Sequence, residues 1–187
     1  MSSLTKKAIR GCFLRLLEQY PLSDISVRMI AEECGINRKS FYYHYRDIPA
    51  LLEEIISDGA DSIIADYNEL GSVEDCLAVM IDTIIGHKNI IRHVFGSVSR
   101  DIFEENLLKV CDYLIRSYVA SVSVGFDILP DDKELVIGYY RGLCFGLILE
   151  WMSKGMRPDI RDSFHRICTL RHGMVDEMMR RMEESRA

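Results

Sequence analysis

A short segment near the N-terminus carries side chains that suit contact with nucleic acid. Its candidate contact residues are Arg38, Lys39, Ser40 and Tyr42. Guanidinium, ammonium and hydroxyl groups donate hydrogen bonds to phosphates and to base edges in the major groove of DNA. Phe41 and Tyr45 are expected to face inward. The spacing equally fits an ordinary corner between two helices whose charged face is only solvated.

A second set of residues has a spacing that could hold a metal ion. His165, Cys168 and His172 lie at i, i+3 and i+7, on one face of a predicted helix. Imidazole and thiolate groups are ligands that zinc prefers, but a fourth ligand is not evident. Polar residues at a helix interface explain the spacing better, so we predict no metal and no cofactor.

Enzyme motifs are missing from the sequence. It contains no GxGxxG, Walker A, HExxH or GxSxG pattern. The paired carboxylates Glu53-Glu54 and Glu104-Glu105 are adjacent within predicted helices, so the two members of each pair point in different directions. We therefore predict that the protein is not an enzyme.

Hydrophobic periodicity predicts a helix-turn-helix around the candidate segment. An apolar stripe over residues 27–34 follows Ser26, which can cap a helix N-terminus. Gly35 ends this helix, because glycine adopts a left-handed backbone at little cost. Asn37 then caps a short helix from Arg38 to about Tyr43. A turn of this kind lets the second helix project into a major groove.

The rest of the chain also has helical periodicity, and no stretch alternates with a period of two residues. One amphipathic helix precedes the motif over residues 9–20, and another follows it from Asp47 to about Tyr67, with Pro49 in its first turn. Further helices are expected near residues 73–86, 88–95, 100–123, 131–154 and 159–184. The sequence therefore predicts an all-α protein.

Charge is distributed unevenly along the chain. The first 46 residues hold eight basic and four acidic side chains, a net charge of +4, whereas the whole chain of 187 residues carries −6. The remaining residues therefore carry −10. A basic head on an acidic body is typical of a DNA-binding domain joined to a body that does not bind DNA, although chance can produce the same asymmetry.

Three features indicate a cytoplasmic location without membrane contact. The N-terminal MSSLTKKAIR has neither the apolar core nor the cleavage site of a signal peptide. The longest apolar run, from Leu143 to Met152, contains Glu150 and is too short to span a bilayer. The six cysteines are scattered without a CxxC pair, as suits a reducing compartment.

Several short motifs in the N-terminal part carry a family resemblance. They are Ile30-Ala31, Gly35-Ile36, Ser40-Phe41-Tyr42, His44-Tyr45 and Leu51-Leu52. With them, residues 5–58 resemble the N-terminal domain of the TetR/AcrR family of bacterial regulators. The resemblance implies a three-helix helix-turn-helix DNA-binding domain over residues 1–48. It also implies a C-terminal helical ligand-binding and dimerisation domain over residues 49–187, with about nine helices in all.

The resemblance also implies roles for individual residues in binding DNA. The implied contact residues are Ser26, Arg28, Arg38, Lys39, Ser40, Tyr42, Tyr43 and His44. Lys39 would face a guanine or a phosphate, and Tyr42 a thymine methyl group or the backbone. Other roles remain open for some of them: Arg28 can pair with Glu32 one turn on, Tyr43 can be partly buried, and His44 can bond only to the backbone.

The start of the helix after the motif departs from the family pattern. Many relatives have a basic residue there that holds a phosphate, whereas this chain has Ile48-Pro49. The N-terminus of that helix can still offer backbone N–H groups to phosphate. One charged contact is nevertheless missing, so we expect weaker or less salt-dependent operator binding.

The segment from Tyr139 to Asp159 resembles the penultimate helix of a TetR subgroup that includes regulators of dihydroxyacetone kinase genes. Its matching features are Gly142, Gly146, Glu150-Trp151 and Lys154-Gly155-Met156. Glycines recur every four residues and make one smooth helix face. We predict a homodimer interface at Gly138, Gly142, Gly146, Ile167 and Met174, built as a four-helix bundle. Close packing within one subunit is the alternative.

A small-molecule pocket is expected in the C-terminal domain. Its candidate residues are His87, Phe95, Phe103, Tyr113, Tyr140 and Trp151, although each is also a common core residue. Two functions follow. The first is a repressor that binds a pseudo-palindromic operator of double-stranded DNA as a homodimer and is released by an unknown small-molecule effector. The second is a co-regulator or adaptor that acts through a protein partner, with weak or no DNA binding of its own.

Overall fold

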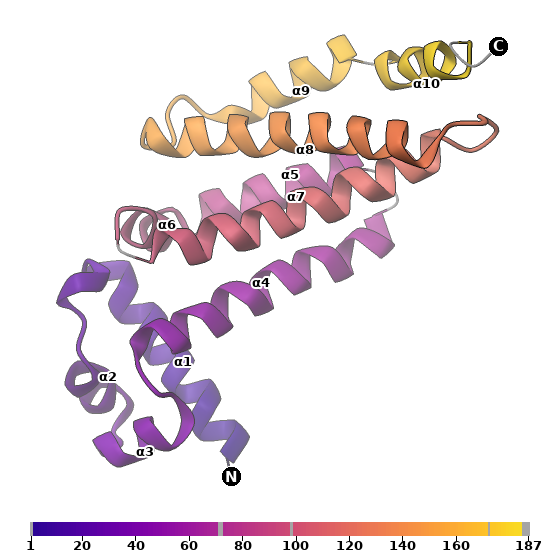
Figure 1. Cartoon of the computed structure of the whole chain (residues 1–187). Helices are drawn as coiled ribbons and strands as arrows, with labels where there is room; N and C mark the ends of the chain where they lie inside the picture. The colour runs from indigo at the N-terminus through magenta and orange to yellow at the C-terminus, as the bar shows by residue number, and fades with distance from the viewer. Residues whose placement is uncertain (1, 71–72, 98, 172, 185–187) are drawn as a thin grey trace. The chain divides into compact units, whose positions relative to one another are not determined.

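The chain folds into ten α-helices and one short 3-10 helix over the residues that the computed structural model describes, which are 2–70, 73–97, 99–171 and 173–184 (Figure 1). No strand occurs in these ranges, so the all-α prediction is confirmed. The first five α-helices are α1 (Ser2–Gln19), α2 (Val27–Cys34), α3 (Arg38–His44), α4 (Ile48–Leu70) and α5 (Val73–Gly86). The others are α6 (Lys88–Phe95), α7 (Arg100–Val122), α8 (Pro130–Ser153), α9 (Ile160–Arg171) and α10 (Met174–Glu184).

Two compact units make up the chain. The N-terminal unit comprises Met1–Ala60 and Gly86–Asn106, and the C-terminal unit comprises Asp61–Ile85 and Leu107–Ala187. The N-terminal unit therefore contains α6 as well as the helix-turn-helix. It extends past residue 48 because Val94 of α6 is buried in the same hydrophobic cluster as the residues of α1. In addition, Nδ1 of His93 lies 2.7 Å from the carbonyl oxygen of Leu17.

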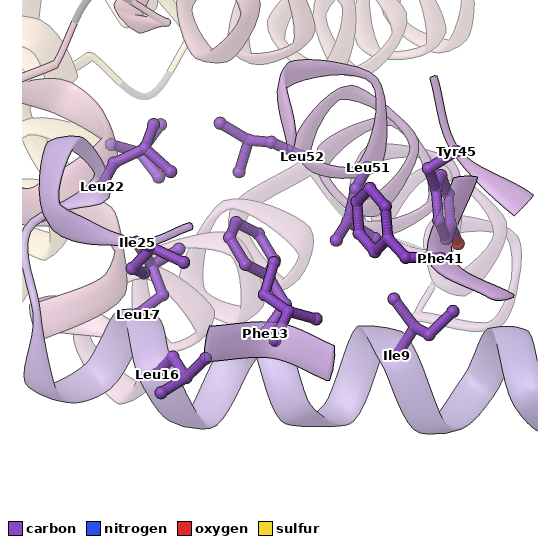
Figure 2. Close-up of a cluster of buried hydrophobic side chains, with 12 residues drawn as sticks. Ile9, Phe13, Leu16, Leu17, Leu22, Ile25, Phe41, Tyr45, Leu51 and Leu52 are labelled. Carbon is purple, nitrogen blue, oxygen red and sulfur yellow. The ribbon is translucent and has the colours of Figure 1, made fainter. Parts of the chain in front are cut away.

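A single hydrophobic cluster holds the helix-turn-helix together. Figure 2 shows its side chains gathered between α1 and α4, with Phe41 and Tyr45 beside Leu51. The fully buried members include Ile9, Phe13, Leu17, Ile30, Phe41, Leu51 and Leu52. Burying a large apolar side chain contributes about 1.5–3 kcal/mol, so this cluster can fix the orientation of a helix as short as α3.

Polar caps define where the short helices begin. The Ser26 hydroxyl accepts a hydrogen bond from the backbone N–H of Met29 at 3.3 Å, and the Asn37 side chain accepts one from the N–H of Ser40 at 2.9 Å. Gly35 ends α2 in the left-handed conformation, with φ of 65°. The predicted caps and the predicted break between α2 and α3 are thus confirmed.

The C-terminal unit has its own core. It contains Ile115 and Val119 from α7, Val136, Ile137 and Tyr140 from α8, and Val175 and Met179 from α10. Ion pairs reinforce the packing of α7 on α8, because Arg141 lies 2.7 Å from Asp112 and Arg116 lies 2.6 Å from Glu134. In this unit α8 therefore packs against both α7 and α10.

The predicted helix over residues 159–184 is two helices in the structure. The chain leaves α9 at Arg171 and begins α10 at Met174, and Gly173 between them has a left-handed φ of 77°. Apolar periodicity continues on both sides of Gly173, so the periodicity alone did not reveal the break.

Helix α8 is apolar on more than one face. It spans 24 residues and includes an 18-residue window with a mean hydropathy of 1.3, which is long and apolar enough to cross a membrane by length and composition. Core helices of soluble proteins pass the same test. Only 33% of this window is buried in the described chain. The second face of α8 is therefore apolar without being covered by the subunit itself.

Candidate DNA-binding surface and effector cavity

Helix α3 presents a basic and aromatic outer face. Phe41 is fully buried and Tyr45 nearly so, and these two side chains fix the inner face of the helix. The remaining surface of the helix exposes Arg38 and Lys39 together with Tyr42, which is 51% exposed. This arrangement leaves guanidinium, ammonium and phenol groups free to reach phosphates and base edges.

A carboxylate behind α3 connects three elements of the N-terminal unit. Glu54 of α4 accepts hydrogen bonds from the Tyr45 hydroxyl and from Arg10, each at 3.0 Å, and forms an ion pair with Lys6 at 2.7 Å. Burial alone would raise the pKa of Glu54, but the hydrogen bonds from Lys6 and Tyr45 outweigh it and lower that pKa below its ordinary value. Burial, followed by the hydrogen bond to Glu54, raises the pKa of Tyr45.

The N-terminus of α4 carries a negative charge of its own. The Asp47 carboxylate accepts a hydrogen bond from the N–H of Ala50 at 2.8 Å and forms an ion pair with Arg46 at 2.9 Å. The bond from Ala50, followed by the one from Arg46, lowers the pKa of Asp47. One of the N–H groups that this helix end could offer to phosphate is therefore already bonded to a carboxylate.

An apolar cavity of about 120 Å³ lies in the C-terminal unit. Its lining comes from α5, α7, α8 and α9, namely Ile81, Ile115, Tyr140, Leu143, Cys144, Leu147, Ile148, Ile160, Ser163, Phe164 and Ile167. No charged side chain belongs to this lining among the described residues. Leu143 and Ile167 are 44% and 36% exposed, so the cavity reaches the surface of the unit.

The glycines of α8 lie on an open face. Apart from adjacent residues and the nearby backbone of α8 itself, no atom of the described chain comes within 4 Å of a Cβ placed on Gly138, Gly142 or Gly146. The same region exposes large apolar side chains, including Leu135 at 70% and Tyr139 at 61%. The alternative interpretation required close packing of the glycine stripe within one subunit. Nothing described in the subunit packs closely against the stripe.

Comparison with known proteins identifies the family. Residues 14–55 match the family of bacterial regulatory proteins of the tetR type, and residues 71–173, more than half of the chain, match the C-terminal region of a group of these transcriptional regulators. The chain belongs to the TetR family. The family prediction is confirmed, and the family consists of transcriptional regulators rather than enzymes. No curated protein sequence matches the chain.

Solved structures share the TetR fold with this chain. The dihydroxyacetone kinase operon activator DhaS superposes with a TM-score of 0.75 at 17% identity, covering 96% of this chain and 98% of DhaS. The fatty acid degradation regulator FadR from Bacillus halodurans has a TM-score of 0.55 at 14% identity, covering 89% and 93%. FadR from Bacillus subtilis, in complex with stearoyl-CoA, has the same score and identity, covering 88% and 96%. At these identities the similarity shows the fold.

The other predicted DNA contacts of this TetR protein differ in their exposure and in the partners that they already have. Arg28 is exposed but bonds to Glu32, with 2.7 Å between Nε and Oε1. Ser40 is half-buried and its hydroxyl donates to Asn37. Tyr43 is 80% exposed and does not belong to the core, and its ring meets the edge of half-buried His44 with 5.0 Å between centroids. Exposed ion pairs such as the one at Arg28 contribute little, so DNA can replace this pairing.

The six predicted pocket residues do not gather at one place. Tyr140 lines the cavity, but His87 is exposed, and the Phe95 ring lies under the Arg100 guanidinium at 4.0 Å. Phe103 packs on the core of the N-terminal unit, and Trp151 is buried with its indole N–H donating to the carbonyl of Pro158. Tyr113, the sixth, is half-buried on α7 and is not among the lining residues. Sequence periodicity marked these aromatics as buried or interfacial but could not show which of them meet.

The structure does not test the spacing of His165, Cys168 and His172 as a metal site. His165 is exposed on α9, while the Cys168 side chain and His172 lie outside the described residues. Across the described part of the chain, no group of three His, Cys, Asp or Glu side chains is arranged to hold a metal ion.

Proposed function

We propose that the protein is a homodimeric transcriptional repressor of the cytoplasm. Its two α3 helices bind successive major grooves of a pseudo-palindromic operator, and a small molecule in the apolar cavity releases it. The exposed basic and aromatic face of α3, held by buried Phe41 and Tyr45, carries this proposal. Helix-turn-helix dimers place their recognition helices about one helical turn of DNA apart.

The open face of α8 supports the dimer. A helix that is apolar all round is normally buried on all sides, and the glycines allow a second helix to approach closely. The predicted interface residues Ile167 and Met174 are 36% and 55% exposed, which leaves them available to a second copy. Because Leu143 and Ile167 also line the cavity, a ligand there would lie directly beneath the proposed dimer interface.

Selection of binding sites from random duplexes tests the proposal directly. The purified protein is expected to enrich a two-fold symmetric sequence, with an affinity that falls steeply as salt rises. Lys39→Ala combined with Tyr42→Ala should abolish the enrichment, because losing one good base contact already costs about 1–3 kcal/mol. Lys154→Ala, at an exposed position on the C-terminal unit, is the matched control and should change nothing.

A second function is favoured by the start of α4. Ile48-Pro49 stand where many relatives hold a phosphate with a basic residue, and the adjacent Asp47 carboxylate already occupies the N–H of Ala50, so the head lacks one charged contact and has one backbone donor fewer. We therefore keep the alternative of a co-regulator that acts through a protein partner. If no duplex binds at low salt, and the Lys39→Ala, Tyr42→Ala variant regulates normally in cells, the co-regulator replaces the repressor.

A further inference from the structure

Two cysteines meet at the wall of the apolar cavity. The Sγ atoms of Cys111 on α7 and Cys144 on α8 lie 3.8 Å apart. Cys111 is fully buried, whereas Cys144 is half-buried and lines the cavity. A disulfide needs about 2.05 Å between its sulfur atoms, so these thiols can join after a small shift of their side chains. Their placement leaves Cys144 as the thiol that a bound molecule meets first.

The cavity restricts what can reach this pair. Its volume of about 120 Å³ is close to that of an engineered apolar cavity of about 150 Å³ that binds benzene. Its wall is almost entirely apolar, the Tyr140 hydroxyl donates to the sulfur of Met178 on α10, and no charged side chain belongs to the lining among the described residues. A neutral molecule with a single ring fits such a site, whereas an acyl-CoA or another anionic ligand would lose its hydration without compensation.

We propose that Cys111 and Cys144 form a redox-active dithiol that senses small neutral quinones in this cavity. Cys144 adds to a ring carbon of the quinone, an S–C bond forms, and a ring electron pair moves to the carbonyl oxygen. Cys111 then gives its proton to the oxygen that has gained the electron pair and attacks the sulfur of Cys144, so that an S–S bond forms and the S–C bond breaks. The released electron pair stays with the ring. The two thiol protons end on the two oxygens, and the products are one disulfide and one hydroquinone.

Hydrogen bonding assigns the order of the two steps. Cys111 donates its S–H to the sulfur of Cys144. This bond, followed by burial, raises the pKa of Cys111 well above its ordinary value. Cys144 lines the cavity, whereas Cys111 is fully buried and is not among the lining residues, so a bound quinone meets the sulfur of Cys144 first. Cys144 is therefore the attacking group, and Cys111 resolves the adduct.

The chain supplies an internal control. Cys12 and Cys34 of the N-terminal unit also interact through their thiols, and burial followed by that contact raises the pKa of Cys34 to about 12. Neither residue belongs to the lining of the described cavity. If proximity of two thiols were sufficient, both pairs would react alike; if the cavity selects the oxidant, only Cys111 and Cys144 will react with a quinone.

Peptide mapping after anaerobic treatment with 1,4-benzoquinone tests the proposal. The reduced full-length chain carries Cys76→Ser and Cys168→Ser, so that only the two pairs remain. We expect a Cys111–Cys144 disulfide and an equimolar yield of hydroquinone. Cys144→Ser should give neither product, and Cys111→Ser should keep the quinone covalently bound at position 144. A three-ring quinone, too large for the cavity, should react at least tenfold more slowly.

Several results would overturn the proposal. One is a stable quinone adduct without a disulfide in the chain that retains both cysteine pairs. Another is oxidation of Cys12 and Cys34 to the same extent as the cavity pair. A third is faster formation of the disulfide with hydrogen peroxide than with benzoquinone. The regulatory meaning of the disulfide rests on the proposed function, which is measured separately as operator affinity before and after closure. Absence of DNA binding in the reduced protein would contradict the repressor and leave the disulfide assay unaffected.

Discussion

The side chain of Glu54 shows how one residue can hold the recognition helix in place. Its carboxylate receives Lys6, Arg10 and the Tyr45 hydroxyl, and Tyr45 directly follows α3. Three donors to one half-buried carboxylate favour its charged form. The position of α3 therefore depends on an electrostatic contact as well as on the hydrophobic cluster.

Replacing Glu54 with glutamine is expected to change how stability depends on pH. Because the folded-state pKa of Glu54 lies below its ordinary value of 4.5, the charged form stabilises the fold above that pH, and this contribution is lost as the pH falls through the folded pKa. Glu54→Gln should lower the free energy of unfolding at neutral pH by about 1–2 kcal/mol and flatten its fall below about pH 4.5, as measured by urea denaturation.

Glu53→Gln is the matched control for this experiment. Glu53 is the exposed neighbour on the same helix, and the variant removes the same charge. The two variants should therefore differ in how their free energy of unfolding depends on pH. Identical pH profiles for both would show that the contacts of Glu54 do not stabilise the head.

At the residue scale the sequence predicted local contacts well and distant ones poorly. The caps at Ser26 and Asn37 act within three residues, so their types and positions were sufficient to predict them. The bond between Arg10 and Glu54 joins residues 44 positions apart, and the contact of Cys111 with Cys144 spans 33. Such contacts depend on which helix faces pack together, which composition and periodicity do not specify.

At the scale of elements, the sharp turn between α2 and α3 depends on one backbone conformation. Gly35 has a left-handed φ of 65°, and no described atom beyond its two chain neighbours lies within 4 Å of a Cβ placed there, so the constraint is in the backbone alone. Gly35→Ala should lower the free energy of unfolding by about 1–2 kcal/mol, the cost of that conformation for a residue with a Cβ. Urea denaturation followed by circular dichroism would measure it.

Gly59→Ala is the matched substitution with the opposite expected sign. Gly59 lies inside α4 with open space around its Cβ position and no left-handed backbone. Alanine favours a helix interior by about 0.5–1 kcal/mol over glycine, so this variant should be more stable. Equal effects at positions 35 and 59 would mean that the left-handed turn does not limit stability.

Most helix bounds were predicted to within a few residues because glycine and proline interrupt the pattern at most ends. Two bounds were missed: α1 begins at Ser2 although its apolar stripe was read only from residue 9, and Gly173 separates α9 from α10 within a periodicity that continues on both sides. The lining of the cavity was also beyond prediction, apart from Tyr140, because it requires α5, α7, α8 and α9 to meet. Local patterns therefore defined the elements, but not the site that the elements build together.

At the scale of the whole molecule, the two apolar faces of α8 have different surroundings. One face lies in the core with Val136, Ile137 and Tyr140, and the other carries the glycine stripe with exposed Leu135 and Tyr139. Charge is also divided along the chain. The body is acidic and would be repelled by DNA, so the proposed operator contacts fall to the basic head. Operator affinity should then depend on linking two heads, because the second head binds at a high effective concentration.

A bulky charge on the glycine stripe should separate the two proposed copies without unfolding either. In Gly142→Arg, the new side chain enters open space within the described subunit and replaces glycine with a better helix former. We expect the thermal stability of the monomer to be kept, analytical ultracentrifugation to show dimer dissociation, and operator affinity to fall at least a hundredfold, since a single head binds only a half-site. Gly86→Arg, also exposed at a helix end without close neighbours, should leave the dimer intact. A Gly142→Arg protein that remains dimeric would place the interface on another surface.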